Sequence, residues 1–169
     1  MKTFSAKLDD LSKIITYVIA AVLVIPLIML TQIAARGNPE VLIPFAVVII
    51  VLAVALLFRV KSYVLTPTEL QIVRQVGAKS FPINTFKSAT PATTKELVFG
   101  LRLFGSGGWA GYFGTFFYRN VGKVSVFATD RKKLILLRTK DDRQILVSPE
   151  DTEGFLKALK LPKERIERE

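Results

Sequence analysis

One stretch constrains this chain more than any other, because residues 41–58 run for 18 positions without a charged side chain. At about 1.5 Å of rise per residue, such a helix reaches nearly across the roughly 30 Å hydrocarbon layer of a bilayer. Residues 14–35 have the same character, and only residues 36–40 separate the two runs. So short a polar connection forces two spanning helices to lie antiparallel. The sequence therefore predicts a transmembrane helical hairpin over residues 14–60, with spans 14–35 and 41–60.

The basic residues around this hairpin predict its orientation, since Lys and Arg accumulate on the cytoplasmic side of a membrane. The connection between the spans contains only Arg36. Seven basic residues flank the outer ends: Lys2, Lys7, Lys13, Arg59, Lys61, Arg74 and Lys79. We therefore expect a multi-pass protein of the cell membrane with both termini in the cytoplasm. The alternative of a cleaved signal peptide is disfavoured, because the first run is longer than the roughly 7 to 15 residues of a signal sequence.

Composition narrows the chemistry of the remaining chain. There are no cysteines and no histidines, which excludes disulfides, thiolate nucleophiles, Cys/His zinc sites and histidine acid–base catalysis. We expect no catalytic residue, no cofactor and no metal site, and hence no enzyme. From residue 61 onward, 19 Lys and Arg stand against 11 Asp and Glu, a net charge of +8. Residence beside an anionic leaflet explains this excess without a nucleic-acid partner.

After residue 61 the pattern changes to short apolar segments separated by turn residues about every ten positions, which is typical of β-structure. The expected strands are residues 63–65, 70–73, 80–83, 85–89, 123–129, 134–139 and 144–147. We expect the last three to form an antiparallel meander, and residues 91–95 to form a loop. Residues 1–13 are predicted to be a short cytoplasmic segment, as an interfacial half-turn or disordered. Residues 61–161 then form one small domain, and 162–169 a charged tail.

One amphipathic helix is predicted at the end of this domain, over residues 151–161. Ser148 is a plausible N-cap, with Pro149 at the first helical position. Phe155, Leu156 and Leu159 fall on one face. We expect this face to lie against the open end of the sheet and to close its core.

Residues 99–118 are unusual, since eight of these twenty residues are aromatic in a chain that is 10% aromatic overall. The segment is also rich in glycine. Two interpretations remain open. Either the glycines permit a loop or bulge while the aromatic rings fill the core, or Trp109, Tyr112 and Phe113 stand on a mobile loop at the membrane interface or a partner surface. Gly105, Gly107 and Ala110 match a dinucleotide fingerprint in spacing only, because no helix is predicted to follow them.

Basic residues supply the other candidates for an interaction surface. Arg102 and Arg119 flank the aromatic segment. Two charged turns contain the rest, namely Arg131, Lys132, Lys133, Lys140 and Arg143. They are either solvated charges on hairpin turns or contacts to anionic headgroups, each contributing about 1 kcal/mol near such a surface.

The order of these elements resembles a family of bacterial pleckstrin-homology (PH)-like domain proteins in which a membrane hairpin precedes the domain. The resemblance covers about residues 63–161. It depends on glycine-rich residues 104–108 with Gly111 and Gly114, on residues 126–131 and 134–139, and on residues 147–151 leading to Phe155. It implies a membrane α-helical hairpin followed by a mainly-β PH-like barrel, with two packed antiparallel sheets capped by a C-terminal α-helix.

The resemblance also implies a binding or scaffolding module at the cytoplasmic membrane face and not an enzyme. Phosphoinositide-binding PH domains place Lys and Arg in their first hairpin, whereas residues 66–69 here include none. Inositol-phosphate binding is therefore not carried over. The leading hypothesis is engagement of a protein partner or self-assembly. The alternative is peripheral recognition of anionic lipid headgroups by the basic turns and the aromatic segment.

Overall fold

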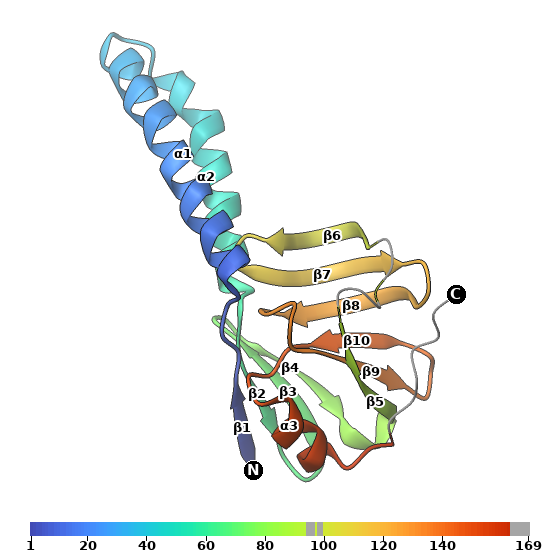
Figure 1. The fold of residues 1–169 in the computed structure, drawn as a ribbon. Coiled ribbons are helices and arrows are strands. Elements are labelled where there is room, and N and C mark those ends of the chain that lie inside the picture. Colours follow the sequence, from blue (N-terminus) through green and yellow to red (C-terminus); the bar gives the residue numbers. More distant parts are fainter. Residues whose placement is uncertain (94–96, 98–99, 163–169) are drawn as a thin grey trace.

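The computed structural model describes residues 1–93, 97 and 100–162, and shows a long helical hairpin attached to a two-sheet domain (Figure 1). Helices α1 (Asp10–Ala35) and α2 (Leu42–Leu57) are joined through the 3₁₀ turn Pro39–Val41. Both helical segments are long and apolar enough to cross a membrane. No residue in their most apolar stretches is buried against the rest of the chain. The two predicted runs are thus confirmed as helices. The charged tail expected at residues 162–169 lies, apart from Pro162, outside the described residues, as do Thr94 and Lys95 of the expected loop.

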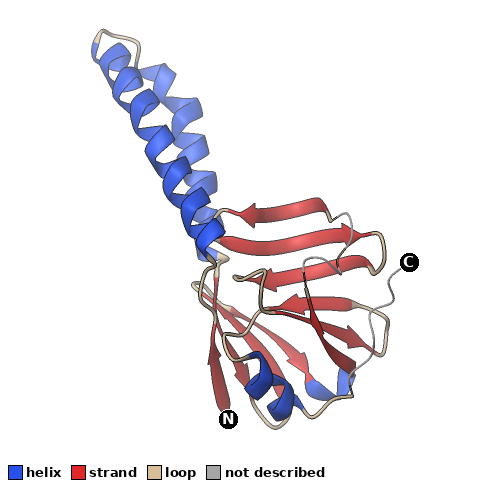
Figure 2. Cartoon of the chain, in the orientation of Figure 1, coloured by secondary structure: helices blue, strands red, loops and turns tan. Residues whose placement is uncertain are grey.

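The domain consists of two sheets, which Figure 2 shows in red with the helices in blue. The smaller sheet has the order β1-β2-β3-β4 and the larger one β5-β9-β10-β8-β7-β6. The smaller sheet comprises β1 (Lys2–Ser5), β2 (Val60–Leu65), β3 (Glu69–Arg74) and β4 (Ala78–Pro82). The larger sheet comprises β5 (Phe86–Ala92), β6 (Leu101–Gly108), β7 (Gly111–Tyr118), β8 (Gly122–Ala128), β9 (Leu134–Thr139) and β10 (Gln144–Val147).

The N-terminal segment differs from its prediction. Instead of a half-turn or disorder, Lys2–Ser5 forms β1 and pairs antiparallel with β2, which follows the hairpin. Phe4 is buried there, edge-on to Phe155 with ring centroids 5.2 Å apart. The chain therefore begins in the domain, passes through the hairpin and returns to the same sheet. Both ends of the hairpin are held by one folded unit.

The predicted meander of the last three strands is wrong in its order. Strand β10 pairs antiparallel with β9 but parallel with β8, so it lies between them. All other pairings of the described strands are antiparallel. The hydrophobic alternation of these strands fits either order, since it sets which face each residue occupies and leaves the choice of neighbour open. The prediction of two packed, mainly antiparallel sheets with a C-terminal helix is confirmed.

The main core lies between the two sheets and is closed by α3 (Thr152–Leu159). Phe155 is completely buried and Leu159 almost so, which confirms the predicted apolar face. The predicted cap was wrong. Asp151 is the N-cap and accepts a hydrogen bond from the Gly154 amide, whereas the Ser148 hydroxyl accepts from the backbone amides of Thr129 and Asp130.

A second apolar cluster covers the opposite face of the larger sheet and includes Tyr112, Phe116 and Leu97. Strand β9 contributes side chains to both clusters. Ile135 and Leu137 belong to the main core, while Leu134 and Leu136 belong to the second cluster. This explains its continuous apolar sequence, which is typical of strands covered on both faces.

Candidate functional site at the base of the helical hairpin

The tip of the β6–β7 hairpin is hydrogen-bonded to both long helices. From α1, the Ser12 hydroxyl donates to the Gly108 carbonyl at 2.5 Å, and the Thr16 hydroxyl accepts from the Ala110 amide at 3.3 Å. The Trp109 indole N–H donates to the Leu52 carbonyl of α2 at 3.0 Å. These contacts join residues far apart in the sequence, and they fix the tip of the β-hairpin beside the helices.

Asp9 links the start of α1 to the domain. One carboxylate oxygen accepts from the Ser12 amide at 2.8 Å and caps the helix, while the other accepts from the Arg131 amide at 3.3 Å. The Tyr112 hydroxyl donates to the same carboxylate at 3.3–3.4 Å, and the Arg131 guanidinium lies over the Tyr112 ring. Burial, and then the Asp9 charge, raise the pKa of Tyr112 to about 12, which favours the neutral phenol that donates to Asp9.

The β3–β4 turn is bonded to the end of α2. The Val76 amide donates to the Leu57 carbonyl and the Gln75 amide to the Arg59 carbonyl, each at 3.1 Å. The last carbonyls of a helix have no partner within the helix, so the turn supplies donors that water would otherwise provide. The two sheets therefore both contact the base of the hairpin, the smaller through β3–β4 and the larger through β6–β7.

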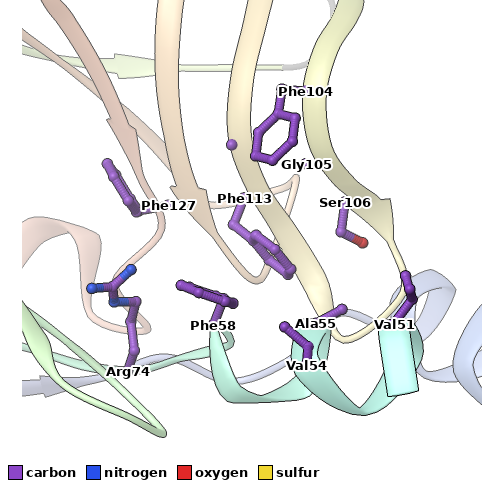
Figure 3. A pocket seen from close by; sticks show the side chains of 11 residues that line it. Val51, Val54, Ala55, Phe58, Arg74, Phe104, Gly105, Ser106, Phe113 and Phe127 are labelled. Atoms are coloured by element: carbon purple, nitrogen blue, oxygen red, sulfur yellow. The ribbon is translucent and has the colours of Figure 1, made fainter. Parts of the chain in front are cut away.

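A cavity of about 470 Å³ lies between α2, the end of β3 and the β6–β7 hairpin. Its lining is mainly apolar, with Arg74 as the charged exception: Val51, Val54, Ala55, Phe58, Arg74, Phe104, Gly105, Ser106, Phe113, Gly114 and Phe127. In Figure 3 Arg74 lies beside Phe58 and Phe127 at one end, and Val51 lies at the other. Phe58 and Phe113 stack with ring centroids 6.4 Å apart. The size suits a small apolar ligand.

Gly105 and Gly114 face each other across the strand pair in the wall of this cavity. Both have positive φ, 106° and 122°, and a Cβ on either would collide with the backbone of the neighbouring strand. Glycine is therefore required at both positions. A register shift between Arg102 and Phe104 accompanies them, so the predicted bulge in this glycine-rich segment is present.

The three aromatic candidates lie near the base of the helical hairpin, each with different neighbours. Trp109 is half-buried against the helices, Tyr112 is buried beside Asp9, and Phe113 stacks on Phe58. The interpretation in which the aromatic rings fill the core holds for only some of these residues, and contact with a membrane or a partner stays a prediction. Tyr112 and Phe116 belong to the core, whereas Trp109 and Phe113 contact the helical hairpin and Phe104 remains exposed.

The basic candidates do not form one surface. Arg131, Lys132 and Lys133 precede β9 near the helical hairpin, where Arg131 meets Asp9 and the Lys133 ammonium donates to the Glu150 carbonyl. The other four basic candidates lie at the end of the larger sheet that is far from the helical hairpin. There Arg143 pairs with Asp141 at 3.0 Å. That distant group comprises Arg102, Arg119, Lys140 and Arg143.

Sequence reasoning missed Asp9 and Arg74 as parts of the site. Asp9 followed by Ser12 ahead of an apolar run is an N-cap signal that the sequence offered. Arg74 contributed only to the charge count, because nothing local connects it to Phe58 or Phe104. Its place in the cavity depends on the packing of both sheets against α2.

A model of the bacterial PH domain family matches residues 61–162. The match covers more than half of the chain and the part that forms β2 to α3, so the protein belongs to this family. The resemblance inferred from residues 63–161 is confirmed. No curated protein and no solved structure matches the chain.

Proposed function

We propose that this protein is a non-enzymatic, membrane-anchored binding module that holds a protein partner, or a second copy of itself, along strand β6 at the cytoplasmic face of the cell membrane. The family supports a binding or scaffolding role. The two long apolar helices support the membrane anchor, and the basic residues at their outer ends support the orientation.

The observation that carries this proposal is the difference between β6 and the other sheet edges. Strands β1 and β4 are only four and five residues long, and short edge strands discourage pairing. Strand β5 is partly covered, because its Ala89 amide donates to the Pro162 carbonyl. Strand β6 is eight residues long, and within the described residues its only strand partner is β7.

Three apolar side chains of β6 are also exposed. Leu101, Leu103 and Phe104 have 63%, 53% and 78% of their surface accessible. Leu101 pairs with Phe117 and Phe104 with Thr115, and paired residues share a face of the sheet, so an apolar strip runs along the open edge. A long apolar edge strand is suited to strand addition, in which backbone hydrogen bonds supply affinity and alternate side chains supply selectivity.

The chain has no cysteine, so one introduced thiol reports on one position. We expect a Leu103→Cys variant, joined to a short photoreactive maleimide in intact membranes, to give a reproducible cross-linked product. A Lys140→Cys variant, exposed in the distant turn, is the matched control and is expected to give little. Adding Leu101→Lys to Leu103→Cys should abolish the product. Recovery of monomer alone, or equal products at both positions, would refute binding along β6.

A further inference from the structure

The cavity beside α2 has an apolar end and a charged end, arranged along the helix axis. Val51, Val54 and Phe58 lie on the cavity side of α2 or at its end, so the lining spans seven residues of rise, or about 10 Å. Arg74 lies at the Phe58 end, where its guanidinium carbon is 5.4 Å from the ring centroid. In the proposed membrane orientation, the hydrocarbon end of the cavity points into the bilayer and the cation lies at its cytoplasmic surface.

Arg74 has an unsatisfied side-chain N–H at the hairpin base. Its Nε is buried and makes no hydrogen bond, and no carboxylate in the described part of the chain lies within ion-pair distance. The Val76 and Gln75 hydrogen bonds to the end of α2 hold the following turn in place, which keeps the guanidinium beside Phe58. A buried guanidinium N–H normally has an acceptor, and the strongest acceptors for it are carboxylate and phosphate oxygens.

We infer that this cavity binds one anionic phospholipid of the cytoplasmic leaflet, with an acyl chain between α2 and the β6–β7 hairpin and the phosphate at Arg74. The inference rests on the proposed membrane anchorage and is separate from binding along β6. It differs from headgroup recognition by the charged turns, because none of those turns lines the cavity.

The shape of the cavity favours an acyl chain over a protein segment. The cavity, of about 470 Å³, lies against Val51 and Val54, whose side chains are exposed on α2 and, in a bilayer, already face lipid. A lipid reaches this space from within the leaflet, whereas an extended polypeptide segment would carry unsatisfied backbone groups into hydrocarbon. The glycine pair Gly105 and Gly114 leaves part of the sheet wall without side chains.

The test uses the full-length protein in nanodiscs of phosphatidylcholine and phosphatidylglycerol in a 4:1 ratio. A trace of phosphatidylglycerol with a photoactivatable acyl chain supplies the label, and peptide mapping locates it. We expect labelling within residues 51–58 and 104–114. Arg74→Gln should reduce it about tenfold, as expected for loss of a charge-assisted hydrogen bond. Ala55→Phe, which fills the cavity, should reduce it similarly while keeping Arg74.

Arg59→Gln is the matched control, since Arg59 carries the same charge at the end of α2 without lining the cavity. It should leave labelling unchanged. If Arg74→Gln and Arg59→Gln lowered the labelling equally, the cause would be the general attraction of positive charge to the membrane, and the inference would be overturned. Equal labelling by a photoactivatable phosphatidylcholine would overturn the inference too, because the cavity would then show no preference for an anionic lipid. So would labelling that is insensitive to Ala55→Phe. Unfolding temperatures of all variants in nanodiscs show which ones are folded.

The two proposals fail independently. Leu101→Lys should abolish cross-linking at residue 103 and leave lipid labelling intact, whereas Arg74→Gln should do the reverse. Failure of the protein to enter nanodiscs would contradict the membrane anchor itself and therefore both proposals.

Discussion

The two ends of the larger sheet use the same residue types in different ways. At the end next to the helical hairpin, called the hairpin end, Asp9 caps α1 and pairs with Arg131. Trp109 there donates a hydrogen bond to α2. At the distant end, Arg143 and Asp141 are exposed and pair within one turn. Charged turns that look alike in the sequence therefore differ in role. The hairpin end couples the domain to the helices, and exposed pairs like the distant one contribute at most about 1 kcal/mol.

The largest expected effect sharpens this contrast through two glycines with positive φ. Gly105→Ala at the hairpin end should destabilise the protein by about 3–5 kcal/mol, because a Cβ there meets the β7 backbone in addition to the strain of positive φ. Gly122→Ala, at the distant end of the larger sheet, with φ of 78° and open space around it, should cost only about 1–2 kcal/mol. Denaturant unfolding, followed by far-UV circular dichroism, measures both. Equal costs would show that the close approach of β6 and β7 is relieved by movement.

The next effect concerns Tyr63, which joins the sheets near the hairpin. Its hydroxyl donates to the Phe127 carbonyl at 2.7 Å and accepts from the Ser148 amide at 3.0 Å. Burial raises the pKa of Tyr63 from 10.0 to about 12, so the fold favours the neutral phenol. This stabilisation is complete below pH 10 and is lost as pH rises from 10 to 12, a change of about 3 kcal/mol.

Tyr63→Phe should remove this part of the pH dependence while costing about 1–3 kcal/mol at pH 7, since two buried groups lose their partner. Unfolding free energies between pH 8 and pH 12 test it. An unchanged pH slope in Tyr63→Phe would assign the alkaline loss of stability to other groups.

A smaller effect compares two aspartates. Asp9→Ala removes the cap of α1 and the contacts to Tyr112 and Arg131, and should cost about 2–3 kcal/mol. Asp141→Ala removes only an exposed pair and should change stability by less than about 0.5 kcal/mol. Thermal unfolding in matched detergent compares them. If the two variants unfolded alike, the ends of the sheet would not differ in the way proposed.

The parts of the fold that depend on local pattern were predictable from the sequence. The apolar runs predicted both long helices, and the alternating segments predicted most strands. Phe155 and Leu159 predicted the buried face of α3. Errors arose where a distant partner decides the outcome. Lys2–Ser5 becomes a strand because β2 offers an edge, and Ser148 leaves the expected cap because the Thr129 and Asp130 amides need an acceptor.

The candidate site was less predictable for the same reason. Aromatic and glycine enrichment marked residues 99–118 as unusual, and Trp109 and Phe113 do lie against the helices. The cavity, however, takes its lining from α2, β3, β6, β7 and β8, and no spacing in the sequence connects Val51 with Arg74 or Phe104. Such a site appears only when the domain is packed on the hairpin.

The central claim is that the hairpin end of the domain is fixed at the bilayer surface, where it presents β6. Trp109 is the only tryptophan in the chain, so its fluorescence reports on this place alone. The protein is reconstituted in vesicles whose lipids carry bromine at defined acyl positions. Trp109 bonds to Leu52, about 9 Å along α2 from Phe58, so the account predicts a blue-shifted emission that is quenched most by bromine on the upper part of the acyl chains. Emission typical of water without quenching, or strongest quenching from the bilayer centre, would contradict it.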